Sequence, residues 1–271
     1  MRRRLQANAV LGAALVGLLL AVIALGFVWT PYDPIAIDLD HPLAAPGLAH
    51  WLGTDEFGRD VLSRAMLGAR ISGAIAAGVV TASVTLGLAI GLAAGFFGRW
   101  VDRVIMVLND AVLAFPGILL ALALMAVLGP SYGSLILALS VAYLPSVVRV
   151  VRASVLSIRE REFVEASRVA GDGRLYTLLR HVLPNALPPV VVLATSLFGW
   201  AILAESALSF LGVGVPPPAP TWGNMLSSAR PYMERAEWLS IAPGLCIAIS
   251  LLGVNMLGDA LRDWLDPRSE T

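Results

Sequence analysis

The chain alternates between long uncharged apolar segments and shorter segments that carry almost all of its charges. A helix needs about 20 apolar residues to cross the hydrocarbon core of a bilayer, which is about 30 Å thick. Uncharged runs of at least that length occupy residues 5–32, 71–98, 111–148, 182–204 and 238–258. The pattern therefore predicts an all-α membrane protein, with spans at 10–29, 71–98, 182–204 and 238–258 and further helix within 111–148.

The run over 111–148 is too long for one span. Its middle contains a strong turn signal, Gly129-Pro130-Ser131-Tyr132-Gly133, in which Gly and Pro both disfavour a continuous helix. We therefore expect two spans joined by a tight hairpin, which brings the predicted total to six transmembrane helices.

The first run follows three arginines and so resembles a secretory signal peptide. A signal peptide has an apolar region of about 7–15 residues that ends in small residues. Here the apolar stretch is longer, and it ends in Trp29-Thr30-Pro31-Tyr32, aromatic residues that suit a membrane interface. We therefore expect a retained first span.

The placement of arginine predicts the orientation, since cytoplasmic loops of membrane proteins are enriched in basic residues. With a cytoplasmic N-terminus, the arginines that face the cytoplasm are Arg2, Arg3, Arg4, Arg99, Arg103, Arg149, Arg152, Arg159, Arg161, Arg168, Arg174, Arg180, Arg262 and Arg268, and those outside are Arg59, Arg64, Arg70, Arg230 and Arg235. This bias predicts that both termini are cytoplasmic.

Composition supports the membrane class and narrows the chemistry. Only 14% of residues are charged, against about 25% in soluble domains. The net charge is zero and the sequence has no Lys, so the chain supplies neither a strong attraction for nucleic acid nor the Lys of an ATP-binding P-loop. The single cysteine, Cys246, excludes an intrachain disulfide. Two histidines in one polar loop, His41 and His50, are a weak metal signal, and we predict no metal site.

Ionisable residues within spans are functional candidates by default. Asp110 lies near one end of the third predicted span and Glu205 near the end of the fifth, so a structural role is as plausible for each as a functional one. No acid lies in the middle of a span, which argues against an ion-coupled carrier. Gly87, Gly91 and Gly95 share one helical face, and we expect this face to pack within the subunit rather than against another one.

The most charged segment, 150–181, lies inside on this topology. Residues 157–170 read as a short helix with a charged face, which Gly171-Asp172-Gly173 then ends. Such a helix is suited to dock into a groove of another protein, but a solvated linker helix fits the periodicity equally well.

Two motifs resemble a known family, the transmembrane permeases of ABC-type importers. The first is similar to that family's cytoplasmic EAA loop and consists of Glu165-Ala166-Ser167, Gly171 and His181-Val182-Leu183-Pro184. Ser167 stands where a second Ala is usual. The second resembles the outer loop of the C-type permease of dipeptide, oligopeptide and nickel systems, and runs Leu52-Gly53-Thr54-Asp55-Glu56-Phe57-Gly58-Arg59-Asp60.

The resemblance implies a type I ABC importer permease that pairs with a homologous second permease, two cytoplasmic ATPase subunits and an extracytoplasmic substrate-binding protein. ATP and Mg would be bound by the ATPase subunits, so no catalytic, cofactor or metal residue is expected in this chain. The residues expected at the ATPase contact are Arg161, Glu165, Ala166, Ser167, Arg168, Gly171, His181, Leu183 and Pro184. Those of the outer-loop motif are Gly53, Thr54, Asp55, Gly58, Arg59 and Asp60.

The resulting organisation has three parts: residues 1–30 as tail and first span, 31–70 as an extracytoplasmic loop, and 71–271 as a five-helix core with the coupling loop at about 150–186. The predicted function is to form half of the path for short peptides across a prokaryotic inner membrane. Nickel, glutathione or another small solute remains an alternative cargo, since specificity in such systems lies largely in the binding protein. A self-sufficient secondary carrier and a membrane scaffold are the alternatives from other classes.

Overall fold

The computed structural model describes residues 2–265, and the side chains of residues 8–265; the predicted inside residue Arg268 lies outside this range. The described part is helical and contains no β-strand, apart from an isolated bridge between Thr54 and Asp60. The elements are α1 (Arg2–Val28), α2 (Val61–Phe97), α3 (Arg99–Leu113), α4 (Gly117–Leu128), α5 (Tyr132–Ile158), α6 (Glu162–Val169), α7 (Arg174–Thr177), the π-helical turn η1 (Leu178–Val182), α8 (Leu183–Phe210), α9 (Trp222–Ala229), the 3₁₀ turn η2 (Arg230–Tyr232) and α10 (Trp238–Leu265).

Five helical segments in residues 2–265 are long and apolar enough to cross a membrane, and the bent pair α3 and α4 makes a sixth if the two count as one span. The pair is bent by 86°. The prediction that the first part of the run 111–148 forms one continuous helix is therefore wrong, because the helix is interrupted between Leu113 and Gly117. Pro116 explains the break, since it has no N–H to donate and it disfavours a helical conformation at Phe115.

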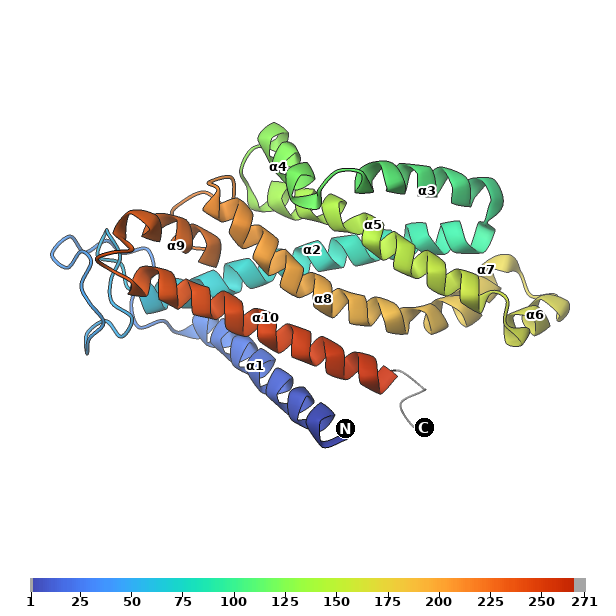
Figure 1. The fold of residues 1–271 in the computed structure, drawn as a ribbon, viewed down its shortest axis with the longest axis horizontal. Helices are drawn as coiled ribbons and strands as arrows, with labels where there is room; N and C mark the ends of the chain where they lie inside the picture. Colours follow the sequence, from blue (N-terminus) through green and yellow to red (C-terminus); the bar gives the residue numbers. More distant parts are fainter. Residues whose placement is uncertain (1, 266–271) are drawn as a thin grey trace.

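Antiparallel packing sets which helix ends lie together. Gly12 of α1 lies against Leu257 of α10, and Gly253 of α10 lies against Leu15 of α1. The start of α1 therefore lies beside the end of α10, and both point toward the end of the molecule that carries α6 and α7 (Figure 1). The loop before α2, together with α9, occupies the opposite end.

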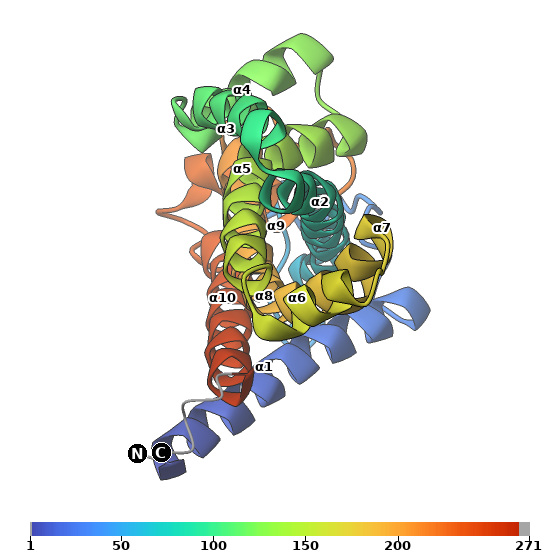
Figure 2. The same cartoon turned by 90° about the vertical axis from the view of Figure 1, so that its right-hand side faces the viewer.

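The core joins α2, α5 and α8, with α3 and α4 on one side of it and α1 on the other (Figure 2). A Cβ at Gly91 would lie 2.6 Å from the Cβ of Val151, and Gly87 and Gly95 meet valines of α5 in the same way. The small residues let the two backbones approach closely. This confirms that the glycine face of α2 packs within the subunit.

The charged loop differs from its predicted boundaries. α5 continues to Ile158, and α6 begins at Glu162 rather than near residue 157, because Arg161 takes an extended conformation (φ −80°, ψ 148°). The helix that enters the next span starts at Arg174 and runs through to Phe210, interrupted only by the π-turn. The π-turn ends two residues before Pro184. In a regular helix the ring of this proline would clash with the carbonyl four residues earlier, and the proline has no N–H to donate.

Candidate functional site

The turn after α6 fixes the shape of the EAA-like loop. The Gly171 N–H donates to the Arg168 carbonyl (3.1 Å), and the Asp172 N–H donates to the Ser167 carbonyl (3.1 Å). These two bonds form a Schellman motif, which requires a left-handed residue just after the helix. Gly171 supplies it, with φ +87°. The predicted stop at Gly171 is therefore confirmed.

The inner face of α6 holds the loop together. The Ser167 hydroxyl donates to Asp172 Oδ2 (2.7 Å) and lies 3.2 Å from Thr177 Oγ1 in α7. Val164, one turn earlier, is fully buried. Ser167, the departure from the family's motif, thus supplies a side-chain bond that ties α6 to the following segment, a role that an Ala could not fill.

The outer face of α6 and α7 is open to solvent. Glu165, Ala166 and Arg168 are exposed. Beside them Val169 has 82% of its surface exposed and Leu175 has 66%. Exposed apolar groups among charged ones are typical of a protein contact surface. We call Glu165, Ala166, Arg168, Val169 and Leu175 the α6–α7 surface.

The other predicted contact residues lie at the two ends of this loop. The carbonyl of Arg161 accepts the first amides of α6, including that of Val164 (3.0 Å). The ring of His181 packs edge-on to the ring of Tyr176, with 5.9 Å between the ring centroids. Leu183 and Pro184 begin α8. Within residues 8–265 no ion pair involves Arg161 or Arg168, so both guanidinium groups can bind another chain.

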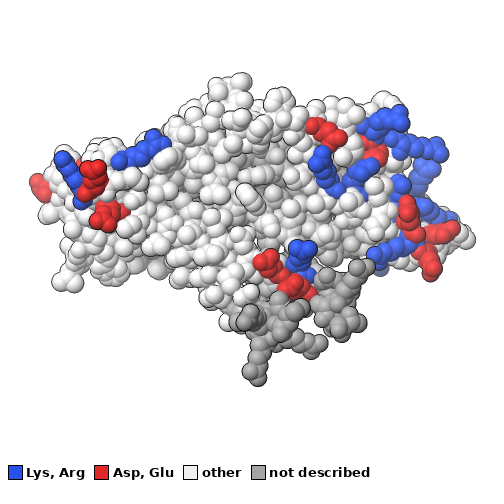
Figure 3. Space-filling model, in the orientation of Figure 1, with Lys and Arg blue, Asp and Glu red and all other residues white. Residues whose placement is uncertain are grey.

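Arginine gathers at the same end of the molecule. Figure 3 shows the basic side chains concentrated over the end that carries α6 and α7, while the opposite end carries a smaller mixed cluster. Two acids of α3 pair with this group: Asp102 with Arg152 (2.7 Å between Oδ2 and Nη2) and Asp110 with Arg149 (2.7 Å). Asp110 thus pairs with an arginine, the contact expected if its role is structural.

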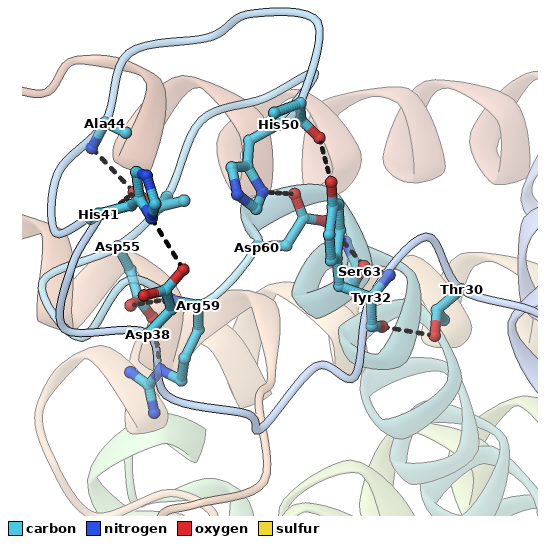
Figure 4. Close-up of polar contacts among 12 residues, drawn as sticks. Thr30, Tyr32, Asp38, His41, Ala44, His50, Asp55, Arg59, Asp60 and Ser63 are labelled. Carbon is cyan, nitrogen blue, oxygen red and sulfur yellow. Dashed lines mark hydrogen bonds and ion pairs between the residues drawn. The ribbon is translucent and has the colours of Figure 1, made fainter.

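The outer-loop motif is mostly buried. Thr54 is fully buried; its hydroxyl donates to the His41 carbonyl (2.6 Å), and its own carbonyl accepts from Trp238 Nε1 of α10 (3.2 Å). Asp55 accepts from Arg59 Nε (2.6 Å) and lies 3.3 Å from Arg64 Nε. The contacts of Trp238 and Arg64 join the loop to α10 and α2. Figure 4 shows Asp55 and Arg59 within the loop.

The start of α2 is capped from the same loop. Asp60 accepts from the Ser63 N–H (2.8 Å) and lies 2.9 Å from His50 Nδ1. A Cβ at Gly58, where φ is +73°, would overlap the Asp38 carbonyl oxygen. Desolvation by burial, opposed by weaker hydrogen bonding, raises the pKa of the Glu56 carboxyl. The motif thus forms a packed scaffold rather than an open binding site.

The two loop histidines do not converge. His41 pairs with Asp38 and His50 with Asp60, each at 2.9 Å. No cluster of three metal-ligating side chains occurs among the described residues.

Glu205 marks a polar cluster that sequence reasoning did not assemble. Its carboxylate is fully buried and accepts from the hydroxyls of Ser209 (2.7 Å) and Ser72 (3.0 Å). The Ser72 hydroxyl also accepts from the backbone N–H of Trp222, the first residue of α9 (3.3 Å). The carboxylate therefore links α8 and α2 directly, and through Ser72 it reaches α9. Only the three-dimensional contact between these distant segments reveals the cluster.

Comparison with known proteins decides the family. A family model described as "Binding-protein-dependent transport system inner membrane component" matches residues 87–271, more than half of the chain. The chain belongs to this family. It is the permease component of an ABC importer, as the EAA-like loop and the all-helical fold both indicate.

Relatives agree with this assignment, and a solved structure shares the fold. The chain is 46% identical to a di/tripeptide transport system permease protein of Pseudomonas aeruginosa over 95% of this chain and 88% of that one. It is 40% identical to a glutathione transport system permease protein of Pectobacterium atrosepticum, over 98% and 89%. An inward-facing structure of the MetNI methionine ABC transporter matches the fold with a TM-score of 0.59 at 19% identity, covering 73% of this chain and 94% of that one.

Proposed function

We propose that this permease forms half of a path that carries short peptides across a bacterial inner membrane. The relatives named for di/tripeptides and for glutathione support this cargo, since glutathione is itself a small peptide. A homologous permease would supply the other half, and an extracytoplasmic binding protein would deliver the peptide to the loop between α1 and α2. This loop ends at Asp60 rather than at the predicted residue 70, because α2 begins at Val61. The five helices after it, within 71–271, would form the core.

The proposed topology has six spans, with the α3–α4 pair as one bent span and both termini in the cytoplasm. The start of α1 and the end of α10 lie together and point toward the arginine-rich end. Basic residues favour the cytoplasmic side, which supports a cytoplasmic position for α6 and α7 and an extracytoplasmic one for the packed outer loop.

The observation that carries the coupling role is the α6–α7 surface. It presents the Glu165 carboxylate beside the exposed side chain of Val169, on a loop held in shape by Gly171 and Ser167. We place this surface in a cleft of a separate ATPase subunit, which would bind ATP and Mg. Glu165 would accept a charge-assisted hydrogen bond there, with Val169 filling an apolar recess.

Replacement of one carboxylate tests the coupling role. A charge-assisted hydrogen bond is worth roughly 1.5–3 kcal/mol, so Glu165→Ala is expected to weaken ATPase association at least about tenfold. The full importer would be purified from native membranes, and co-purifying ATPase and uptake of a radiolabelled dipeptide would be measured. Glu234→Ala is the matched control, because Glu234 is exposed at the opposite end of the molecule.

Two results would overturn the proposal. Unchanged ATPase recovery and uptake in Glu165→Ala would remove the docking role. Transport by the purified chain in liposomes without ATP would instead identify a secondary carrier.

A further inference from the structure

A groove of about 460 Å³ lies between the end of α2, the start of α3 and the segment that holds α6 and α7. Its lining is mostly polar and includes Phe97, Arg99, Arg168, Asp172 and Arg174. The groove belongs to the arginine-rich end of the molecule (Figure 3). We refer to it as the α2–α7 groove.

The groove carries positive charge that the described part of the chain does not neutralise. Arg99, Arg168 and Arg174 are exposed, and none of them forms an ion pair within residues 8–265. Asp172 is the acid among the described lining residues, and its Oδ2 already accepts from the Ser167 hydroxyl (2.7 Å). Guanidinium groups gathered around one hollow suit a phosphate, because each planar guanidinium can donate two parallel hydrogen bonds to phosphate oxygens.

The length of α2 places this groove at the level of the lipid headgroups. Near the other end of the helix, Arg70 donates to the Gly26 carbonyl (2.8 Å) and stacks on Phe27 (3.8 Å to the ring centroid), so it lies where the first span ends. From Arg70 to Phe97 the helix rises about 40 Å, at about 1.5 Å per residue, which matches a bilayer with its headgroup regions, about 40–45 Å. Phe97 and the neighbouring Trp100 are both exposed, as aromatic residues are at a membrane interface.

We propose that the α2–α7 groove binds the phosphate of an anionic phospholipid, whose acyl chains lie beside Phe97 and Trp100. Basic pockets beside membrane helices at the cytoplasmic end suit such headgroups. A free phosphate would use the arginines alone, whereas a phospholipid also contacts the two exposed rings. The groove shares only Arg168 with the hollow beside Glu165 and Val169, so a lipid here and an ATPase on the α6–α7 surface can be bound together. The inference rests on the proposed topology for the choice of leaflet.

Photolabelling tests the site. The importer, purified with its subunits, is placed in lipid nanodiscs that contain phosphatidylglycerol with a diazirine on its headgroup, and labelled peptides are mapped by mass spectrometry. Labels are expected to concentrate in residues 96–100 and 168–177, and phosphatidylcholine with the same diazirine is expected to label them less. Arg99→Gln and Arg174→Gln are each expected to reduce the phosphatidylglycerol labelling about fivefold, from the contribution of one arginine near an anionic membrane surface.

Arg235→Gln is the matched control. Arg235 is an exposed arginine outside the groove, so this variant is expected to label residues 96–100 and 168–177 like the unchanged protein. Equal labelling by the two lipids would overturn the proposal, as would unchanged labelling in both Arg99→Gln and Arg174→Gln. ATPase recovery is measured on the same samples, so failed labelling with normal recovery would refute the lipid site and leave the coupling role intact.

Two further outcomes would assign the groove to another occupant. Loss of labelling in excess inorganic phosphate, compared with chloride at the same ionic strength, would identify a free-phosphate site and overturn the lipid assignment. A short-reach thiol crosslink to the ATPase from Phe97→Cys, in the Cys246→Ala background, would also overturn it, because a protein surface would then cover the groove.

Discussion

Gly171 offers the sharpest test of how the α6–α7 loop keeps its shape. The residue has φ +87°, and a Cβ there would meet no heavy atom within 4 Å. Gly171→Ala therefore introduces no clash, and its whole cost comes from the left-handed backbone. That cost is about 1–2 kcal/mol for a residue with a Cβ.

The strain introduced by Gly171→Ala can be measured as a faster exchange of backbone amide hydrogens in the loop. If the loop opens locally, destabilising its closed form by about 1–2 kcal/mol increases the open population about 5-fold to 30-fold. The amide of Asp172, which donates to the Ser167 carbonyl, would exchange its hydrogen faster by the same factor. Hydrogen exchange of residues 166–177, read by mass spectrometry on the purified importer, measures it.

Two further variants separate backbone strain from the loss of a glycine. Gly173 has φ −67° and an equally open surrounding, so Gly173→Ala is expected to leave exchange unchanged or slower. Gly171→Asn is expected to give an exchange rate between those of the unchanged protein and Gly171→Ala, because Asn tolerates the left-handed region. Equal exchange in Gly171→Ala and Gly173→Ala would refute the reasoning.

Three other predictions follow from the packing and the outer loop. Gly91→Val would force the 2.6 Å approach to Val151 and is expected to cost about 1–3 kcal/mol; the midpoint of thermal unfolding should fall, whereas Gly17→Val, which meets nothing within 4 Å, should leave it unchanged. Asp60→Ala removes the cap of α2 and about 1–2 kcal/mol, so a protease should cut residues 31–60 faster; an unchanged cleavage rate would show that the cap does not hold the loop. Burial raises the pKa of Glu56 above its ordinary 4.5, so its protonated form stabilises the loop at low pH and this contribution is lost as pH rises through the raised pKa; Glu56→Gln should flatten that dependence of loop cleavage on pH, and an identical profile would contradict it.

Local sequence patterns predicted the long helices because lipid imposes a simple rule on them. The lengths of the uncharged runs predicted α1, α2, α5, α8 and α10. The spacing of Gly87, Gly91 and Gly95 predicted a close contact between helices. The break before α4 was missed because hydropathy does not record it. The dipeptide Phe115-Pro116 was the available signal.

Other features depend on contacts between distant segments and could not be read from the pattern. Thr54 meets Trp238, and Ser72 meets Glu205, only after the chain has folded. The outer-loop motif was recognisable as a motif, but its burial was not. Likewise Arg99 is distant in sequence from Arg168 and Arg174, and only the fold brings the three around one groove.

The central claim is that the α6–α7 surface contacts a separate ATPase. Its most direct test is site-specific crosslinking from Val169→Cys, in a chain whose single native cysteine is replaced (Cys246→Ala), with a benzophenone maleimide in native membranes. Met233→Cys, exposed at the opposite end, serves as the control. The account predicts an ATPase adduct from Val169→Cys and none from Met233→Cys. A Val169→Cys protein that supports full uptake but yields no ATPase adduct would contradict it.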